Sequence, residues 1–331
     1  FSLAIYYYRG TNYFKLGQAI EVKDNLDAFM LAGTSTDLSS NDLYLPLLNN
    51  IGSTYSVLGE KQKALDFYEQ ALELSVELGT NEGEATTLNN IGHVYSSLGE
   101  KQKALDYYNK AVLLVRESSN QSGWATVLNN MALVISFHGD KQHALDLYNQ
   151  ALDKLRTDGD KALKATLLNN IGTVHVDLGD RQKAFDFFSQ SFTLGVELGN
   201  KMSQATALNS IGGLHNAYGD KQQAIDSYNK ALTIFREAGH RIGEASTLNN
   251  IGLIHDNRGD MKKALELYYQ AHDILQSSGD RAGQATVIIN IGRVYHFIGD
   301  EQKALDFYNQ ALPIVREVGD KAGEATVLNG I

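Results

Sequence analysis

The pentapeptide LNNIG stands at residues 48–52 and returns at residues 88–92, 168–172 and 248–252. Each interval is 40 residues or a multiple of 40, and no insertion interrupts the register from there to the C-terminus. A fixed period of this length is typical of a solenoid, in which each repeat packs only on its neighbours in sequence. The sequence therefore predicts a continuous array of similar repeats, an architecture that offers a long binding surface more readily than a catalytic centre.

Residues 281–320 show how one repeat is built. Small and apolar side chains recur there at helical spacing in two stretches, which predicts two amphipathic helices. Gly299 stands where the first helix ends, because glycine adopts the left-handed conformation of that position without strain. Asp300 follows as the N-cap of the second helix, and Gly319-Asp320 repeats the same signal. We name the first helix of each repeat its A helix and the second its B helix.

The B helices carry the most regular positions of the chain. An alanine and, four residues later, an aromatic residue recur every 40 residues, and both are expected in the core. The pairs are Ala64 and Tyr68, Ala104 and Tyr108, Ala144 and Tyr148, Ala184 and Phe188, Ala224 and Tyr228, Ala264 and Tyr268, and Ala304 and Tyr308. The alanines allow close helix approach, and the apolar stripes of neighbouring repeats are expected to join into one core.

Composition narrows the classes of function. A net charge of −10 without any basic run argues against nucleic acid or an anionic membrane as the partner. The absence of cysteine excludes disulfides, thiolate zinc sites and cysteine nucleophiles, and it suits the reducing cytoplasm where we expect the protein. No apolar run is long enough to cross a bilayer. The chain starts without Met and stops within a repeat, so we expect a fragment of a longer protein.

In each repeat, the order of Ile-Gly and Tyr, then Gly-Asp, Ala, Tyr and Ala, resembles the tetratricopeptide repeat (TPR). The usual TPR has about 34 residues. Units of 40 residues are similar to those of Leu-Gly-Asn-repeat adaptors, kinesin light chains and bacterial arrays attached to CHAT domains. The resemblance covers residues 41–331 and implies an all-α fold, a right-handed α-solenoid of antiparallel helix pairs. We expect a degenerate first helix pair at 1–43, then one array at 44–331 with seven regular repeats and a truncated last A helix.

The resemblance also implies a site, because in this family peptides lie along the concave surface formed by the A helices. The family's groove positions fall on the second asparagine of each Asn-Asn pair and on the residues three and seven further on. The second asparagines are Asn50, Asn90, Asn130, Asn170, Asn250 and Asn290, and Ser210 interrupts the series. An amide can pair with the N–H and C=O of an extended peptide. Alternatively, these asparagines could bond across neighbouring A helices and hold the stack together.

The variable groove positions are expected to provide selectivity. The predicted peptide-binding set includes His93, Leu133, Phe137, Arg293, His296 and Phe297. Leu133 and Phe137 are one helical turn apart, which predicts an apolar pocket. Arg293, together with His296 and Phe297, is expected to bind an acidic or aromatic side chain. Ordinary variation at solvent-facing positions is the alternative.

Other residue patterns argue against binding of chaperone tails, metal binding and catalysis. Arg293 is the only basic residue among the residues at the groove positions, so we expect no binding of Hsp70 or Hsp90 tails. His175, His215 and His255 recur 40 residues apart, but packed helices lie about 8–10 Å apart, too far for shared zinc ligation. They replace packing tyrosines of other repeats, so we expect packing and no metal. No nucleophile, base and orienting group come together, so we expect no enzyme and no cofactor.

Trp124 departs from the repeat pattern. Six of its counterparts are polar, namely Glu84, Lys164, Gln204, Glu244, Gln284 and Glu324. A single tryptophan at such a position is either a surface anchor for a partner or a local packing feature.

Three functions remain open. The first is a non-catalytic scaffold that binds an extended peptide or partner segment through the row of second asparagines. The second is the sensor arm of a larger effector enzyme, for example a CHAT-type peptidase. The third is self-association through the array ends, since the apolar first segment, with Tyr6, Phe14 and Phe29, lacks the polar face of a cap.

Overall fold

The computed structural model describes residues 41–116, 120–155 and 160–331. Regular structure in these residues is helical throughout, without any strand, as the 40-residue period predicted. The degenerate helix pair expected at 1–43, including Tyr6, Phe14 and Phe29, lies almost wholly outside the described residues. Contacts divide the chain into an N-terminal body, up to Leu167, and a C-terminal body, from Leu168 to Ile331.

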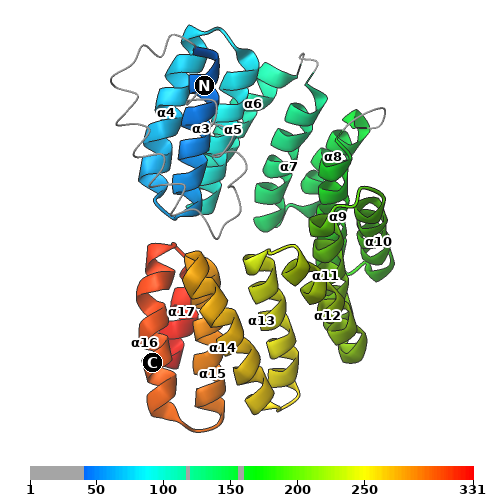
Figure 1. Ribbon diagram of the computed structural model, residues 1–331, viewed down its shortest axis with the longest axis vertical. Coiled ribbons are helices and arrows are strands. Elements are labelled where there is room, and N and C mark those ends of the chain that lie inside the picture. Colours follow the sequence, from blue (N-terminus) through cyan, green and yellow to red (C-terminus); the bar gives the residue numbers. More distant parts are fainter. Residues whose placement is uncertain (1–40, 117–119, 156–159) are drawn as a thin grey trace. The chain divides into compact units, whose positions relative to one another are not determined.

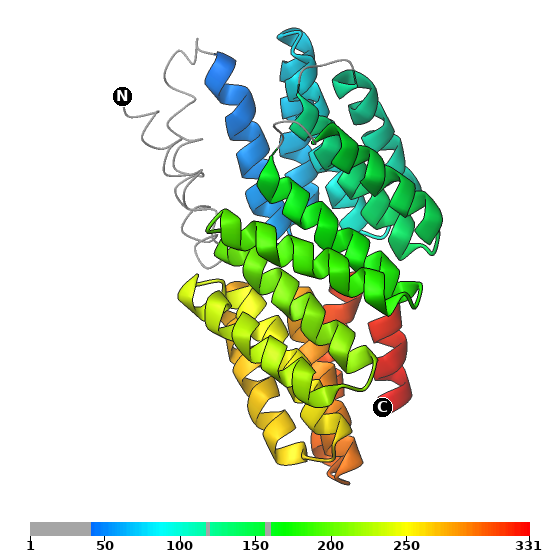
Figure 2. The same ribbon diagram turned by 90° about the vertical axis from the view of Figure 1, so that its right-hand side faces the viewer.

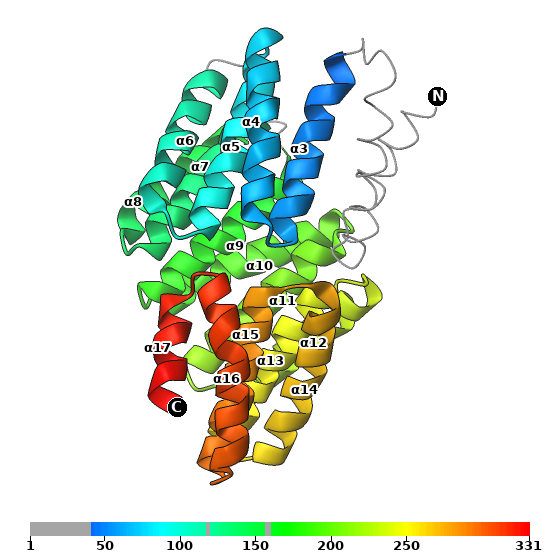
Figure 3. The same cartoon turned by 90° about the vertical axis from the view of Figure 1, so that its left-hand side faces the viewer.

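The N-terminal body contains three A/B pairs within the described residues (Figure 1). They are α3 (Asn41–Val57) with α4 (Lys61–Glu77), α5 (Asn81–Ser97) with α6 (Lys101–Val115), and α7 (Gln121–Phe137) with α8 (Lys141–Lys154). Helix α9 (Lys161–Asp177) begins in this body and continues into the next. In Figure 3, α3 to α6 lie side by side, each against its neighbour in sequence.

The C-terminal body continues the same alternation. Its helices after α9 are α10 (Arg181–Glu197), α11 (Lys201–Ala217), α12 (Lys221–Glu237), α13 (Arg241–Asn257), α14 (Met261–Ser278), α15 (Arg281–Phe297), α16 (Glu301–Glu317) and α17 (Lys321–Gly330). The A helices, which carry odd numbers, begin at 40-residue intervals throughout. The yellow, orange and red helices of this body run side by side in Figure 2.

The turns between helices confirm the predicted stop and restart signal. Gly299 has φ 83°, in the left-handed region, and its N–H donates to His296 O at 3.1 Å. The next residue, Asp300, accepts a hydrogen bond from the Lys303 backbone N–H at 3.3 Å. The carboxylate thereby satisfies one of the free N–H groups at the start of α16.

The glycine of LNNIG is explained by ring packing. Tyr108 of α6 is only 1% exposed, and its ring lies directly against Gly92 of α5. A Cβ on Gly92 would come within 2.7 Å of Tyr108 Cε1, so a larger residue would displace the ring. The same contact recurs between Gly52 and Tyr68, Gly172 and Phe188, Gly212 and Tyr228, Gly252 and Tyr268, and Gly292 and Tyr308.

The A helices of each body form one layer. In the N-terminal body α3 contacts α5 and α5 contacts α7, while in the C-terminal body α11 contacts α13 and α13 contacts α15. Each of these contacts brings the residues at the Asn-Asn positions of one repeat beside those of the next. None of the described helices is long and apolar enough to cross a membrane.

Candidate peptide-binding surface

The asparagine pairs of the N-terminal body bond to each other from repeat to repeat. Asn90 Nδ2 donates to Asn49 Oδ1 at 3.0 Å, and Asn130 Nδ2 donates to Asn89 Oδ1 at 2.9 Å. The second asparagine of each repeat thus binds the first asparagine of the preceding repeat. We call this series of bonds the asparagine ladder.

The C-terminal body repeats the ladder and also shows where it breaks. Asn290 Nδ2 donates to Asn249 Oδ1 at 2.8 Å, and Asn250 Nδ2 donates to Asn209 Oδ1 at 3.5 Å. Asn169 is the exception, because its Oδ1 is buried and has no hydrogen-bond partner. The residue that would donate to it, by the register of the other repeats, is Ser210. A serine side chain has no amide N–H to reach this oxygen.

The sequence left open whether the second asparagines bind a peptide or bond across neighbouring A helices. Bonding across neighbouring A helices is confirmed for Asn90, Asn130, Asn250 and Asn290. Each bond uses one of the two N–H groups of the amide and does not use its Oδ1. Asn130 Oδ1 accepts a separate hydrogen bond within its own repeat, from Asn129 Nδ2 at 3.3 Å. All six second asparagines are half-buried, and their contact with a peptide stays a prediction.

Leu133 and Phe137 project from α7 beside this ladder. Leu133 is 45% exposed and Phe137 is 86% exposed, although both side chains are apolar. Phe137 makes an edge contact with the His138 ring, at 5.4 Å between centroids. Two exposed apolar side chains one turn apart form an apolar patch, for which folding alone gives no reason.

Two members of the predicted cluster at Arg293 face acidic side chains of the chain itself. Arg293 Nη2 donates to Asp256 Oδ2 at 2.6 Å, and His296 Nδ1 lies 2.8 Å from Glu301 Oε2. Both groups already have an acidic partner within the chain, and their contact with a ligand stays a prediction. Phe297 remains 72% exposed and offers a second apolar contact on the A-helix surface. Position-by-position reading missed Asp256 because it belongs to α13, in the preceding repeat.

His93 is exposed on α5, three residues after Asn90. Desolvation by the surrounding protein lowers its pKa, and the Lys61 ammonium lowers it further. The imidazole is therefore neutral near pH 7, where it can donate one hydrogen bond and accept another.

The packing interpretation of the regularly spaced histidines is confirmed for His175. Its ring stacks on Phe187 with 5.5 Å between centroids. Tyr55 stacks on Phe67 in the same way, at 5.4 Å. His255 Nδ1 lies 3.3 Å from Asp260 Oδ2. In the described part of the chain, no group of three or more metal-ligating side chains lies close enough together to bind an ion.

Trp124 lies on α7 and is half-buried, and its role as a surface anchor for a partner stays a prediction. Its ring lines a cavity between α6, α7 and α8. The sequence singled out this residue, but it did not reveal the cavity.

Comparison with known proteins places the fold in a family. The tetratricopeptide repeat family model matches residues 43–117, 83–157, 163–237 and 243–317. These matches span most of the chain, which therefore belongs to the tetratricopeptide repeat family. No curated protein matches the sequence.

Solved structures of low sequence identity share this fold. A Rap protein complexed with competence and sporulation factor has a TM-score of 0.66 and 14% identity, over 96% of this chain and 99% of that one. The apo quorum sensor NprR from B. thuringiensis also has a TM-score of 0.66 and 14% identity, over 95% and 87%. A signal-transduction ATPase with a tetratricopeptide repeat sensor, from Pyrococcus horikoshii, has a TM-score of 0.60 and 14% identity, over 89% and 43%.

Proposed function

We propose that this chain is a non-catalytic protein-interaction scaffold whose A-helix surface binds an extended peptide segment of a partner. The observation that carries this proposal is the exposed pair Leu133 and Phe137 beside the half-buried amide of Asn130. Apolar anchors next to hydrogen-bonding amides suit a peptide, which has both side chains and a polar backbone. The Rap protein of the same fold is complexed with competence and sporulation factor, which supports a recognition role.

The ladder gives the amides a part in this recognition. Since one N–H of Asn90 is held by Asn49, the amide group is fixed in position before a ligand arrives. Its Oδ1 and its second N–H can then pair with a peptide backbone. Each such bond contributes only about 0.5–1.5 kcal/mol, so the amides give register and orientation. In the N-terminal body, selectivity comes from Leu133, Phe137 and the neutral His93. The C-terminal body has an exposed apolar side chain of its own in Phe297.

The composition supports a protein partner and not a nucleic acid. The net charge of −10 repels a polyanion, and Arg293 is already paired with Asp256. The histidines whose 40-residue spacing could suggest a metal site, His175 and His255, are respectively stacked on Phe187 and close to Asp260. A chain without cysteine suits a reducing cytoplasm.

A library of short linear peptides displayed on phage, selected against the full chain, tests the proposal. Selected peptides should bind the variant Leu133→Ser/Phe137→Ser at least about tenfold more weakly, the loss expected for one buried apolar anchor. The matched control is Leu113→Ser, which removes a 70% exposed leucine from the B helix α6. If the control loses affinity and the A-helix variant keeps it, the A-helix surface is not the binding site.

The alternative function is that of a sensor arm in a larger effector protein. The Pyrococcus horikoshii ATPase joins a tetratricopeptide repeat sensor to further domains, and this chain matches 43% of its length. The two functions share the same peptide-binding surface. Sequencing the gene on both sides of the present segment distinguishes them, because an effector domain in the same reading frame supports the sensor arm.

A further inference from the structure

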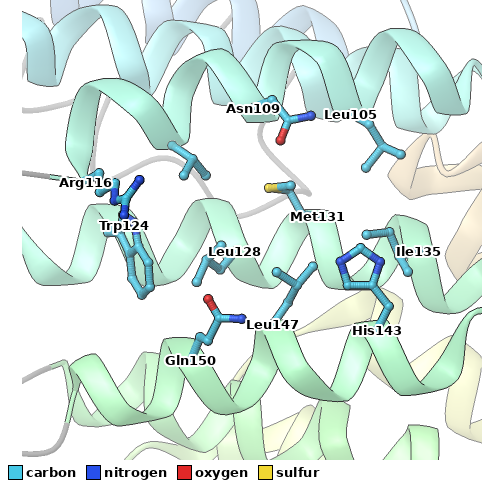
Figure 4. A pocket seen from close by; sticks show the side chains of 11 residues that line it. Leu105, Asn109, Arg116, Trp124, Leu128, Met131, Ile135, His143, Leu147 and Gln150 are labelled. Atoms are coloured by element: carbon cyan, nitrogen blue, oxygen red, sulfur yellow. The ribbon is translucent and has the colours of Figure 1, made fainter.

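A cavity of about 540 Å³ lies between the B helices α6 and α8, over the A helix α7. We call it the α6–α8 cavity. Figure 4 shows Asn109 on α6, Trp124 and Met131 along α7, and Gln150 on α8. Its volume falls in the range of ligand pockets, about 300–1,000 Å³. Asn109 and Gln150 are exposed, so the cavity opens to solvent between the two B helices.

This cavity is separate from the proposed peptide-binding surface. On a helix each residue turns by about 100°, so Trp124, Met131 and Leu133 can be placed around α7. Trp124 and Met131 fall on one side of the helix, and Leu133 falls on nearly the opposite side. The cavity therefore does not depend on the function proposed above.

Two other repeats show what is missing beside the cavity. Arg236 Nε donates to Glu244 Oε1 at 2.9 Å, and this ion pair joins the end of the B helix α12 to the start of the A helix α13. Arg316 and Glu324 form the same pair at 2.7 Å, between α16 and α17. Both pairs bring together an arginine and a glutamate eight residues later.

Arg116 and Trp124 occupy these same two positions in their repeat. A tryptophan has no acceptor for a guanidinium, so Arg116 loses the glutamate that its counterparts have. No acid pairs with Arg116 within residues 41–116, 120–155 and 160–331. The guanidinium lines the cavity and is exposed, which leaves its charge available to a ligand.

Other groups around the cavity also have unused hydrogen-bonding capacity. Trp124 Nε1 is buried without a hydrogen-bond partner among the described residues. The Lys154 ammonium lies over the Trp124 ring, 5.3 Å from its centroid, and adds a second positive charge. The side-chain amides of Asn109 and Gln150, on facing walls, make no hydrogen bond within the described part of the chain. Between them the lining is apolar, with Val112, Leu128 and Leu147.

We propose that the α6–α8 cavity binds an acidic peptide segment, which inserts an apolar side chain between the two B helices and places a carboxylate on Arg116. The carboxylate supplies the acid that this repeat lacks at residue 124. The apolar lining receives the side chain, and the amides of Asn109 and Gln150 pair with the peptide backbone. Charge complementarity selects an acidic segment, because Arg116 lines the cavity and the Lys154 ammonium lies over the ring of Trp124.

Trp124 provides a direct readout, because it is the only tryptophan in the chain. The full chain is titrated with the blocked peptide acetyl-Gly-Leu-Phe-Glu-Gly-amide and with its Gln counterpart, while indole fluorescence is recorded. We expect a saturable change with the Glu peptide and about tenfold weaker binding of the Gln peptide, as for one charge-assisted hydrogen bond. Arg116→Gln should weaken the Glu peptide about tenfold and leave the Gln peptide unchanged.

Two control variants make the result specific. Arg236→Gln removes the arginine of the same repeat position in the C-terminal body and should leave both titrations unchanged. Trp124→Glu restores the residue type of other repeats, so it should fold, pair with Arg116 and abolish binding measured by calorimetry. The proposal is overturned if neither peptide saturates, if both bind equally, or if Arg116→Gln leaves the Glu peptide unaffected.

Discussion

Asn90 donates a side-chain N–H to Asn49 Oδ1 at 3.0 Å, from one repeat to the repeat before it. The recurrence of the Asn-Asn pair therefore has a structural cause that requires no ligand. The first asparagine supplies the acceptor and the second supplies the donor. Since the donor has a second N–H, this bond and peptide binding are compatible in the same residue.

The break in the ladder gives a stability prediction. Asn169 Oδ1 is buried without a partner, and Ser210 stands where the donor should be. Ser210→Asn should restore the bond and raise the free energy of unfolding by about 0.5–1.5 kcal/mol. Urea unfolding followed by circular dichroism measures the gain.

A double-mutant cycle is the control for this prediction. In an Asn169→Ala background, Ser210→Asn has no acceptor to bind and should give no gain. An equal gain in both backgrounds would mean that the new asparagine stabilises the chain by another route.

Two glycines, six residues apart, should respond in opposite directions to alanine. Gly219 has φ 86°, so Gly219→Ala forces an L-residue into the left-handed region and should cost about 1–2 kcal/mol. Gly213 lies inside α11, and a Cβ there would meet only the Tyr228 hydroxyl at 3.6 Å, an ordinary contact. Gly213→Ala should therefore stabilise the chain by about 0.5–1 kcal/mol through helix propensity. Thermal melts of the two variants test the pair, and destabilisation by Gly213→Ala would contradict the packing described here.

Buried tyrosines predict a loss of stability in alkali. Burial raises the pKa of Tyr228 to about 12, against about 10 in an unfolded chain. The folded state therefore keeps the proton that the unfolded state loses. The contribution of Tyr228 to the free energy of unfolding is complete below pH 10. It falls by about 1.4 kcal/mol per pH unit as the pH rises from about 10 to about 12.

Phe188 occupies the same repeat position without a hydroxyl, so Tyr228→Phe is a conservative test. As the pH is raised from about 8 to about 12, the melting temperature should fall less steeply for Tyr228→Phe than for the unchanged chain. Parallel curves for the two proteins would show that this tyrosine does not titrate with unfolding.

The periodic features were predictable because each depends on the residues of one repeat. The left-handed Gly299, the cap at Asp300 and the buried Ala304 follow from spacing and local chemistry alone. Contacts between repeats were not predictable in this way. Arg293 pairs with Asp256 on the preceding A helix. When each repeat position is considered alone, the sequence indicates that Arg293 is an unpaired cation.

The cavity beside Trp124 also depends on contacts between repeats, which the sequence of one repeat does not predict. The sequence marks Trp124 as the only tryptophan, at a repeat position that is polar in six other repeats and holds Tyr44 in the repeat that begins at residue 41. Because residue 124 is a tryptophan, Arg116 has no glutamate at the start of the next A helix. The structure reveals this loss through the corresponding pair of Arg236 and Glu244, which joins a B-helix end to the next A-helix start. Aligning the repeats by charge as well as by apolar pattern would have found that pair.

Photo-crosslinking tests the central claim, peptide binding on the A-helix surface, most directly. Benzoylphenylalanine replaces Phe137 on the A helix α7 in one protein and Leu113 on the B helix α6 in the other; both sites are largely exposed. A peptide selected from the library should crosslink at position 137 and not at position 113. Crosslinking at position 113 alone, with none at 137, would contradict the proposed binding surface.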